Sequence, residues 1–131
     1  MPHVRLSWEA LEQIPQGAGV CWVLPAGGRW ADGVPRVLGN DPSRILFYGC
    51  SSNLRARAGQ FLESLAGPGP HAEGNRIREL NELNPHADLN TFILVWEATP
   101  DGEQEQHKAQ LLHAYFARFG EVPPFNAALP G

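Results

Sequence analysis

The sequence has little of what secreted, membrane-bound or disulfide-stabilised proteins need. Its longest apolar run, Phe92 to Trp96, is far too short to cross a bilayer, and no basic segment followed by an apolar one opens the chain. The two cysteines, Cys21 and Cys50, form neither a disulfide framework nor a CxxC metal pair. We therefore expect a cytoplasmic protein with reduced thiols and no membrane partner.

A surplus of basic residues is also absent. The chain has 10 Lys and Arg against 14 Asp and Glu, which gives a net charge of -4 and a pI of about 5.7. Proteins that bind nucleic acid along its backbone usually carry the opposite balance, because they displace counterions from many phosphates. A local basic patch is still compatible with this composition. Every basic residue except Lys108 is an arginine, whose planar guanidinium binds phosphate through two hydrogen bonds.

Length and composition predict one folded domain. With 131 residues, a hydrophobic fraction of 43% and 4 Trp, the chain can bury a modest core, which excludes intrinsic disorder. The 14 Gly and 12 Pro predict short elements joined by tight loops. We expect a single domain over residues 1–131, with a short N-terminal helix at 7–14 and a core at 19–126.

Three segments are rich in β-branched and aromatic residues and are expected to be strands: 19–24, 44–50 and 89–98. The first two are expected to pair as an antiparallel hairpin. The residues between them, 25–43, are dense in Gly, Pro, Asp and Asn, and predict a loop with a short extended piece at 36–38.

Three further segments space their apolar residues at about 3.6 positions and are expected to be helices: 53–65, 75–83 and 103–119. Ser52 or Asn53 would cap the first of these, and Gly120 would end the last. The expected fold class is α/β, in the α+β sense: a small three-stranded, antiparallel sheet flanked by helices.

Four short motifs follow one another in a characteristic order: GVC in the first strand, FYG in the second, NLRARAGQF in the next helix and PPFN after the last. In this order and on these elements they resemble the GIY-YIG nuclease superfamily, whose layout fits most of the chain. That family has an arginine eight residues after the glycine of its second tripeptide, and Arg57 lies eight residues after Gly49. Its terminal asparagine corresponds to Asn126. The resemblance implies structural roles for Gly49 and Asn126.

The resemblance also implies a chemistry, the hydrolysis of phosphodiesters in DNA or RNA. In the family, water or hydroxide attacks phosphorus, and a single glutamate holds one divalent metal, Mg²⁺ or Mn²⁺. Tyrosines act on the nucleophile or the phosphate, and the arginine neutralises charge in the transition state.

Most of these groups are replaced in this chain. The two tyrosines of the tripeptides correspond to Cys21 and Phe47, and the metal-binding glutamate corresponds to Lys108, whose ammonium would repel a cation. Tyr48 lies next to Phe47, but neighbouring side chains of a strand point to opposite faces, so it cannot simply replace the missing hydroxyl. A further histidine or tyrosine of the family corresponds to Phe61. Such a pattern indicates a dismantled site.

The candidate catalytic residues are Arg57, Tyr48, Lys108 and Cys21. Glu105 lies one helical turn before Lys108 and is the candidate metal ligand of an active site. In a metal-free site, the Lys108 ammonium would itself neutralise phosphate beside Arg57. Candidate nucleic-acid-binding residues on the helices are Arg55, Arg76 and Arg78, although a solvated helix face balanced by acidic neighbours is the simpler account of the last two.

Three functions remain open at this point. The first is a domain with a degraded nuclease site that keeps a phosphate- or nucleic-acid-binding cleft around Arg57. The second is an active endonuclease with a rearranged or metal-independent site. The third is a non-catalytic protein-interaction module, which the net charge favours. Fold alone does not rank them; they differ in whether nucleic acid is cleaved, bound without cleavage, or neither.

Overall fold

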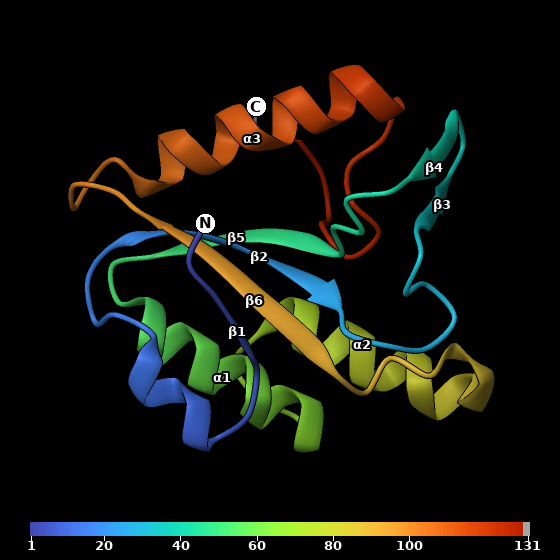
Figure 1. The fold of residues 1–131 in the computed structure, drawn as a ribbon, viewed down its shortest axis with the longest axis horizontal. Helices are drawn as coiled ribbons and strands as arrows, with labels where there is room; N and C mark the ends of the chain where they lie inside the picture. The colour runs from blue at the N-terminus through green and yellow to red at the C-terminus, as the bar shows by residue number, and fades with distance from the viewer. Residues whose placement is uncertain (130–131) are drawn as a thin grey trace.

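A four-stranded antiparallel sheet forms the centre of the computed structural model, which describes residues 1–129 (Figure 1). Its strands lie in the spatial order β1 (His3–Arg5), β6 (Phe92–Ala98), β2 (Gly19–Pro25) and β5 (Phe47–Ser51). The expected number of three strands is therefore wrong. The additional strand, β1, pairs with β6 and has a single buried residue, which is too short a pattern to be recognised in a sequence.

The expected antiparallel hairpin is confirmed, with Cys21 opposite Gly49 and Trp22 opposite Tyr48. β5 begins later than expected because Arg44 ends the preceding loop. Its φ is 61°, and its Nη1 donates to the carbonyl oxygens of Pro25 and Ala31, both at 3.0 Å.

β6 also begins later than expected, at Phe92 instead of residue 89. The side chain of Asn81 pairs with the backbone of Leu89: Nδ2 donates to the Leu89 carbonyl at 2.8 Å, and Oδ1 accepts its N–H at 3.2 Å. These bonds tie Leu89 to a helix and keep it out of the sheet.

The long loop between β2 and β5 contains a second, two-stranded sheet, β3 (Val34–Arg36) and β4 (Gly39–Asp41). The extended piece expected at 36–38 is mostly the turn of this hairpin. Fully buried Asp41 anchors the hairpin, because its carboxylate accepts from Ser43, from the Ile45 N–H at 3.2 Å and from the Tyr115 hydroxyl at 3.0 Å.

The helices are α1 (Leu54–Ala66), α2 (Ala72–Leu83) and α3 (Gln104–Phe119), with short 3₁₀ segments η1 (Glu9–Gln13) and η2 (Pro85–Ala87). Asn53 caps α1 through its side chain, which accepts the Ala56 N–H at 3.0 Å, and Gly120 ends α3 with a φ of 74°. In place of the N-terminal helix expected at 7–14, the structure has the five-residue 3₁₀ segment η1, which ends before Pro15.

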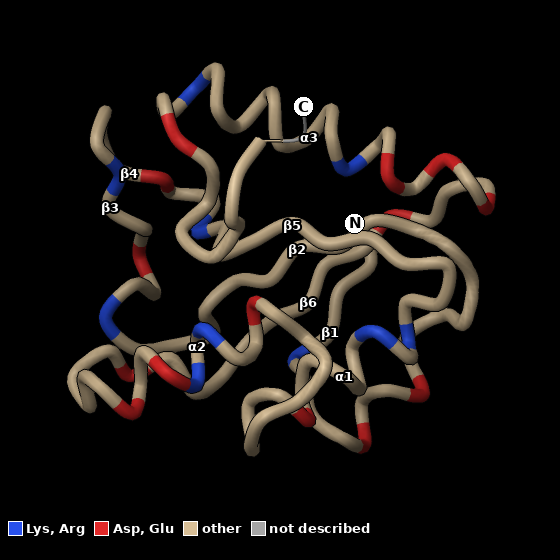
Figure 2. The backbone as a smooth tube through the Cα atoms, turned by 180° about the vertical axis from the view of Figure 1, so that it is seen from behind, with Lys and Arg blue, Asp and Glu red and all other residues tan. Residues whose placement is uncertain are grey.

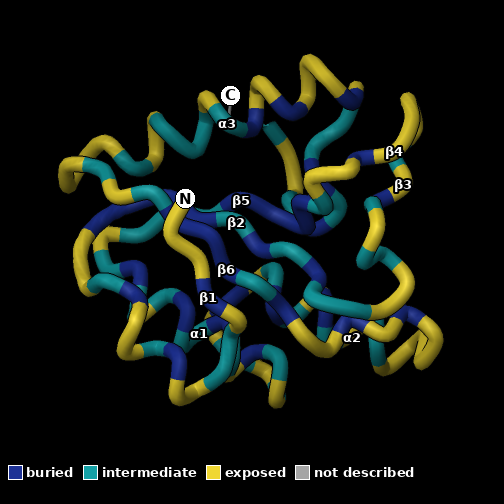
Figure 3. Tube along the Cα trace, in the orientation of Figure 1, coloured by how far each residue is buried: buried dark blue, intermediate teal, exposed yellow. Residues whose placement is uncertain are grey.

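Helices cover both faces of the sheet: α1 and α2 lie against one face and α3 lies against the other (Figure 1). Alternation along β5 places Phe47 in the larger core cluster with α1 and α2, and Tyr48 in the smaller cluster with α3. Buried positions follow the strands and the inner sides of the helices (Figure 3). α1 and α2 approach closely at Gly74, where a Cβ would lie 3.0 Å from the Cβ of Ser64.

Within residues 1–129, no helix combines the length and the apolar character that crossing a membrane requires.

Candidate functional site

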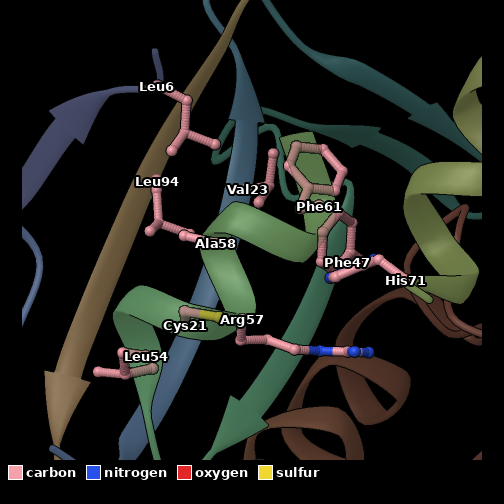
Figure 4. Close-up of a pocket in the computed structure, with 10 residues that line it drawn as sticks. All are labelled: Leu6, Cys21, Val23, Phe47, Leu54, Arg57, Ala58, Phe61, His71 and Leu94. Atoms are coloured by element: carbon pink, nitrogen blue, oxygen red, sulfur yellow. The ribbon is translucent and has the colours of Figure 1, made fainter. Parts of the chain in front are cut away.

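Arg57 lies in the first turn of α1, and its side chain extends from an apolar pocket toward solvent. Its stem runs along a pocket that also contains Cys21, Phe47 and His71, and its guanidinium lies on the side of Phe47 and His71 (Figure 4). Nη1 donates to Oε1 of Gln60 at 2.9 Å, and Nη2 lies 3.9 Å from Oε2 of Glu73. The side chain is 30% exposed. The guanidinium is therefore both positioned and accessible.

The positions where the resemblance implies tyrosines are buried and apolar. Phe47 is 1% exposed, and its ring centroid lies 5.4 Å from those of both Phe61 and His71. Cys21 is also buried, and burial raises the pKa of its thiol to about 12. Near neutral pH these positions neither accept nor release a proton.

His71 is the side chain of this pocket that the sequence did not single out. It caps α2, because its Nδ1 accepts the Gly74 N–H at 3.1 Å. The side chain is 4% exposed; burial, together with the positive charges of Arg57 and Lys108, lowers its pKa to about 3. The ring is therefore neutral and carries its proton on Nε2. Since Nδ1 is an acceptor, its 3.4 Å approach to Glu73 is not an ion pair.

The sequence missed His71 because α2 begins three residues before the expected start at Asn75. Histidine is not among the preferred N-cap residues, whereas the polar residues Ser, Thr, Asp and Asn are. The available signal was the end of the GPGP segment, directly before His71 and the acidic first turn with Glu73.

Lys108 approaches from the opposite layer. On α3 it is half-buried, and with Cys50, Glu105 and Leu112 it lines a cleft of about 210 Å³, which Ala128 and Leu129 complete. Within the described residues no carboxylate oxygen lies within 4.0 Å of its ammonium. The ion pair with Glu105 that would make Lys108 an ordinary flank residue does not form.

The positive charges of Arg57 and Lys108 influence the same three titratable groups, Cys21, Cys50 and His71. Burial raises the pKa of the Cys21 and Cys50 thiols, and the positive charges of Arg57 and Lys108 lower it. For His71, burial and the same two charges all lower the pKa. Cys21 and Cys50 lie on opposite faces of adjacent strands, next to Gly49 in the β2–β5 pairing. Arg57 therefore lies on the α1 side of this part of the sheet, in the pocket with Cys21, and Lys108 lies on the α3 side, in the cleft with Cys50.

The remaining candidate residues of the motifs, Tyr48, Gly49 and Asn126, lie on β5 or contact it. The structure separates Tyr48 from Arg57: its ring is on the α3 face, 5.9 Å from Trp22 and 6.3 Å from Tyr115 between centroids, and burial raises its pKa to about 12. At Gly49 a Cβ would lie 3.3 Å from Sγ of Cys21, so glycine leaves room beside the thiol. The Asn126 amide forms two hydrogen bonds with the Tyr48 backbone.

The three candidate nucleic-acid-binding arginines are held by backbone carbonyls. Arg55 donates to Ile14 and Glu12 at 2.8 and 3.1 Å. Arg76 donates to Phe125 at 2.7 Å, and Arg78 donates to Ser64 at 3.0 Å. The structure does not bring their guanidinium groups together with Arg57 in one pocket.

The residues present do not fit a bound Mg²⁺ or Mn²⁺. Over residues 1–129, no three His, Cys, Asp or Glu side chains come together in a way that could hold a metal ion. Glu105 shares its cleft with the Lys108 ammonium, which repels a divalent cation.

No protein-family model and no curated protein matches the chain. Among solved structures it is similar to the GIY-YIG N-terminal endonuclease domain of UvrC from Thermotoga maritima, in a crystal structure of a tyrosine-to-phenylalanine mutant bound to its catalytic divalent cation. The match covers 91% of this chain and 93% of that chain, with a TM-score of 0.45 and 16% sequence identity. The chemistry of the site rests on the residues described above.

Proposed function

We propose that this protein is a GIY-YIG-like domain that binds phosphate groups of nucleic acid without cleaving them. The observation that carries the proposal is the positioned and partly exposed guanidinium of Arg57, at a pocket whose other residues supply no catalytic group. The Lys108 ammonium lies in a separate cleft on the α3 side of the sheet.

Hydrolysis would need a group that activates water, and the pocket offers none near neutral pH. Cys21 holds its proton, and Phe47 has no ionisable group. His71 has a pKa of about 3 and uses Nδ1 as a helix cap, which makes it a poor base. The site therefore keeps the charge that binds a phosphate and lacks the groups that would split it.

Binding is local. Arg57 presents a partly exposed guanidinium, and Lys108 an ammonium without a partner in the described residues, so both are available to an anion. Elsewhere in residues 1–129, the Arg positions are scattered and mixed with Asp and Glu, without a continuous basic stripe (Figure 2). We therefore expect few phosphate contacts and a shallow dependence of affinity on salt.

The test is binding and cleavage of labelled single- and double-stranded DNA and RNA, with Mg²⁺, with Mn²⁺ and with EDTA. We expect binding without cleavage in all three, and a loss of about tenfold in affinity for Arg57→Ala or Lys108→Ala, the cost of one charge-assisted contact. Arg118→Ala is the matched control, since Arg118 is exposed and stacks on Phe119, 4.9 Å from the ring centroid.

Each other outcome contradicts the proposal in its own way. Cleavage that Arg57→Ala abolishes would establish an active nuclease with Glu105 or no metal at its centre. If the folded protein neither binds nor cleaves nucleic acid, the remaining hypothesis is a protein-interaction module. Equal losses in Arg118→Ala and Arg57→Ala would mean that binding is non-specific.

A further inference from the structure

The two edges of the central sheet differ in what covers them. At β5, the Asn126 amide and the Phe125 N–H bond to the outward backbone groups of Tyr48 and Leu46. At β1, the other edge strand (Figure 1), no segment within residues 1–129 does the same. Unpaired N–H and C=O groups along a sheet edge are a template for a further strand.

The register of β1 fixes which of its backbone groups are free. The Trp96 N–H donates to the Pro2 carbonyl at 3.1 Å, so Pro2 faces β6. By alternation Val4 also faces β6, and the N–H and C=O groups of His3 and Arg5 point away from the sheet. Among residues 1–129 no group bonds to them. Pro2 does not interrupt this free edge, because its nitrogen is on the side of β6.

The free groups of β1 are complementary to themselves. A twofold axis at Val4 sets β1 antiparallel to β1 of a second copy and places His3 of each copy opposite Arg5 of the other. Each such pair exchanges two main-chain hydrogen bonds, so every free donor and acceptor is used. A slip of one residue would bring groups that face β6 to the interface and would lose these bonds.

The side chains of β1 agree with the same axis. Val4 and Leu6 lie on the face of β1 that packs into the larger core cluster, and alternation places Pro2 on that face too. The axis sets Val4 against Val4 and Leu6 against Pro2, so apolar positions meet apolar positions. A groove of about 410 Å³ beside Val4 and Leu6, which Ala10 of η1 also lines, leaves room for these side chains.

Exposed apolar side chains flank this edge. Met1 and Trp8, which precede and follow β1, are 68% and 54% exposed. Met and aromatic residues are enriched in protein interfaces, whose cores are depleted of charge. The axis also keeps the two Arg5 side chains from facing each other, since each is opposite His3, and like charges directly opposite would destabilise the pairing.

We propose that β1 is the interface of a homodimer, in which a twofold axis at Val4 joins two central sheets into one continuous antiparallel sheet. The partner is a second copy because the free backbone groups and the apolar positions of β1 both match their own rotation. β1 has three residues, so the interface is small and the dimer should be reversible and dependent on concentration. The proposal does not depend on the binding of phosphate groups at Arg57.

Sedimentation velocity of the whole chain, between about 5 and 500 µM, tests the interface. We expect the mean mass to rise from 14.4 kDa toward twice that value as concentration increases. Arg5→Pro removes an outward N–H from each copy and should raise the dissociation constant of the dimer at least about tenfold. Arg5→Ala is the matched control, because it keeps the N–H and should associate as the wild-type protein does.

Disulfide cross-linking tests the axis. Val4→Cys, in a Cys50→Ser background, should form an intermolecular disulfide on mild oxidation, because position 4 faces itself at the short separation of a non-hydrogen-bonded pair. His3→Cys in the same background is the control. It faces Arg5 of the other copy, and the two substituted positions lie too far apart for a disulfide.

The two experiments protect each other against loss of fold, which circular dichroism would show. If Arg5→Pro does not fold, cross-linking decides the question; if Val4→Cys does not fold, sedimentation decides it.

Three results would overturn the proposal. A monomer at every concentration would mean that no second copy pairs with β1. Equal dissociation constants for Arg5→Pro and Arg5→Ala would place the interface on another surface. Cross-linking of His3→Cys as fast as that of Val4→Cys would contradict the axis. Each of these results leaves the proposed function intact, since the binding of nucleic acid is measured separately.

Discussion

The side-chain amide of Asn126 forms two hydrogen bonds with the backbone of Tyr48. Its Oδ1 accepts the Tyr48 N–H at 2.9 Å, and its Nδ2 donates to the Tyr48 carbonyl at 3.0 Å. The Phe125 N–H adds a bond of 3.0 Å to the Leu46 carbonyl. β5 is one of the two edge strands of the sheet, so these bonds take the place of a neighbouring strand beside the proposed site.

Asn126→Ala should therefore destabilise the protein. It leaves the N–H and the carbonyl of Tyr48 without their partners at a half-buried edge, and we expect a loss of about 2–3 kcal/mol in the free energy of unfolding. Urea denaturation measures it. Asn90→Ala, at an exposed loop position, is the control and should change stability by less than about 0.5 kcal/mol. Similar urea midpoints for the two variants would contradict the conclusion that Asn126 stabilises β5.

The stability of the protein should fall in mild acid because of His71. Folding lowers the pKa of this group from 6.5 to about 3, so below pH 6.5 the unfolded chain binds a proton that the folded protein excludes. The contribution of His71 is complete above the unfolded pKa and is lost as pH falls from 6.5 toward 3. The slope approaches about 1.4 kcal/mol per pH unit.

Unfolding of the wild-type protein and of His71→Asn, measured between pH 7 and pH 4, isolates this contribution, since the variant keeps the other titrating groups. The difference in stability between the two should shrink as pH falls. Parallel curves would mean that His71 is not held neutral in the fold.

Lys108→Glu should create a site for a divalent cation. The substitution removes the repelling ammonium and adds a carboxylate to a cleft that already contains Glu105. We expect binding of Mn²⁺ or Mg²⁺ with a dissociation constant of about 10⁻⁴–10⁻³ M, as for weak carboxylate sites, and none in the wild-type protein. Calorimetry measures it. No gain in a folded variant would mean that the cleft does not have the arrangement that the motif spacing implies.

The two tyrosines should respond differently to replacement by phenylalanine. Tyr115→Phe removes one of the hydrogen-bond donors to the buried carboxylate of Asp41. It should lower the free energy of unfolding by about 1–2 kcal/mol, as urea denaturation would measure. Tyr48→Phe, whose hydroxyl lies on the face away from Arg57, should leave nucleic-acid binding unchanged. A loss of nucleic-acid binding in Tyr48→Phe would mean that the Tyr48 hydroxyl takes part in the binding site.

Patterns along the chain predicted the core elements well where periodicity was strong. The β2–β5 hairpin, the cap of α1 at Asn53 and the end of α3 at Gly120 follow from residue types whose local preferences agree with the fold. The fourth strand and the start of α2 did not follow, because β1 is three residues long and His71 is an uncommon cap.

The sequence alone determined which positions carry charge and that Tyr48 faces away from Phe47. It also predicted, from the resemblance, that Phe47 and Lys108 replace a tyrosine and a glutamate. Only the tertiary structure decided that Lys108 has no partner in the described residues, that Arg55, Arg76 and Arg78 are bound to backbone carbonyls, and that His71 lines the same pocket as Arg57. Residue identity sets what a group can do. Burial and the neighbours that the fold supplies set its charge and its free hydrogen bonds, and these depend on segments far apart in the chain.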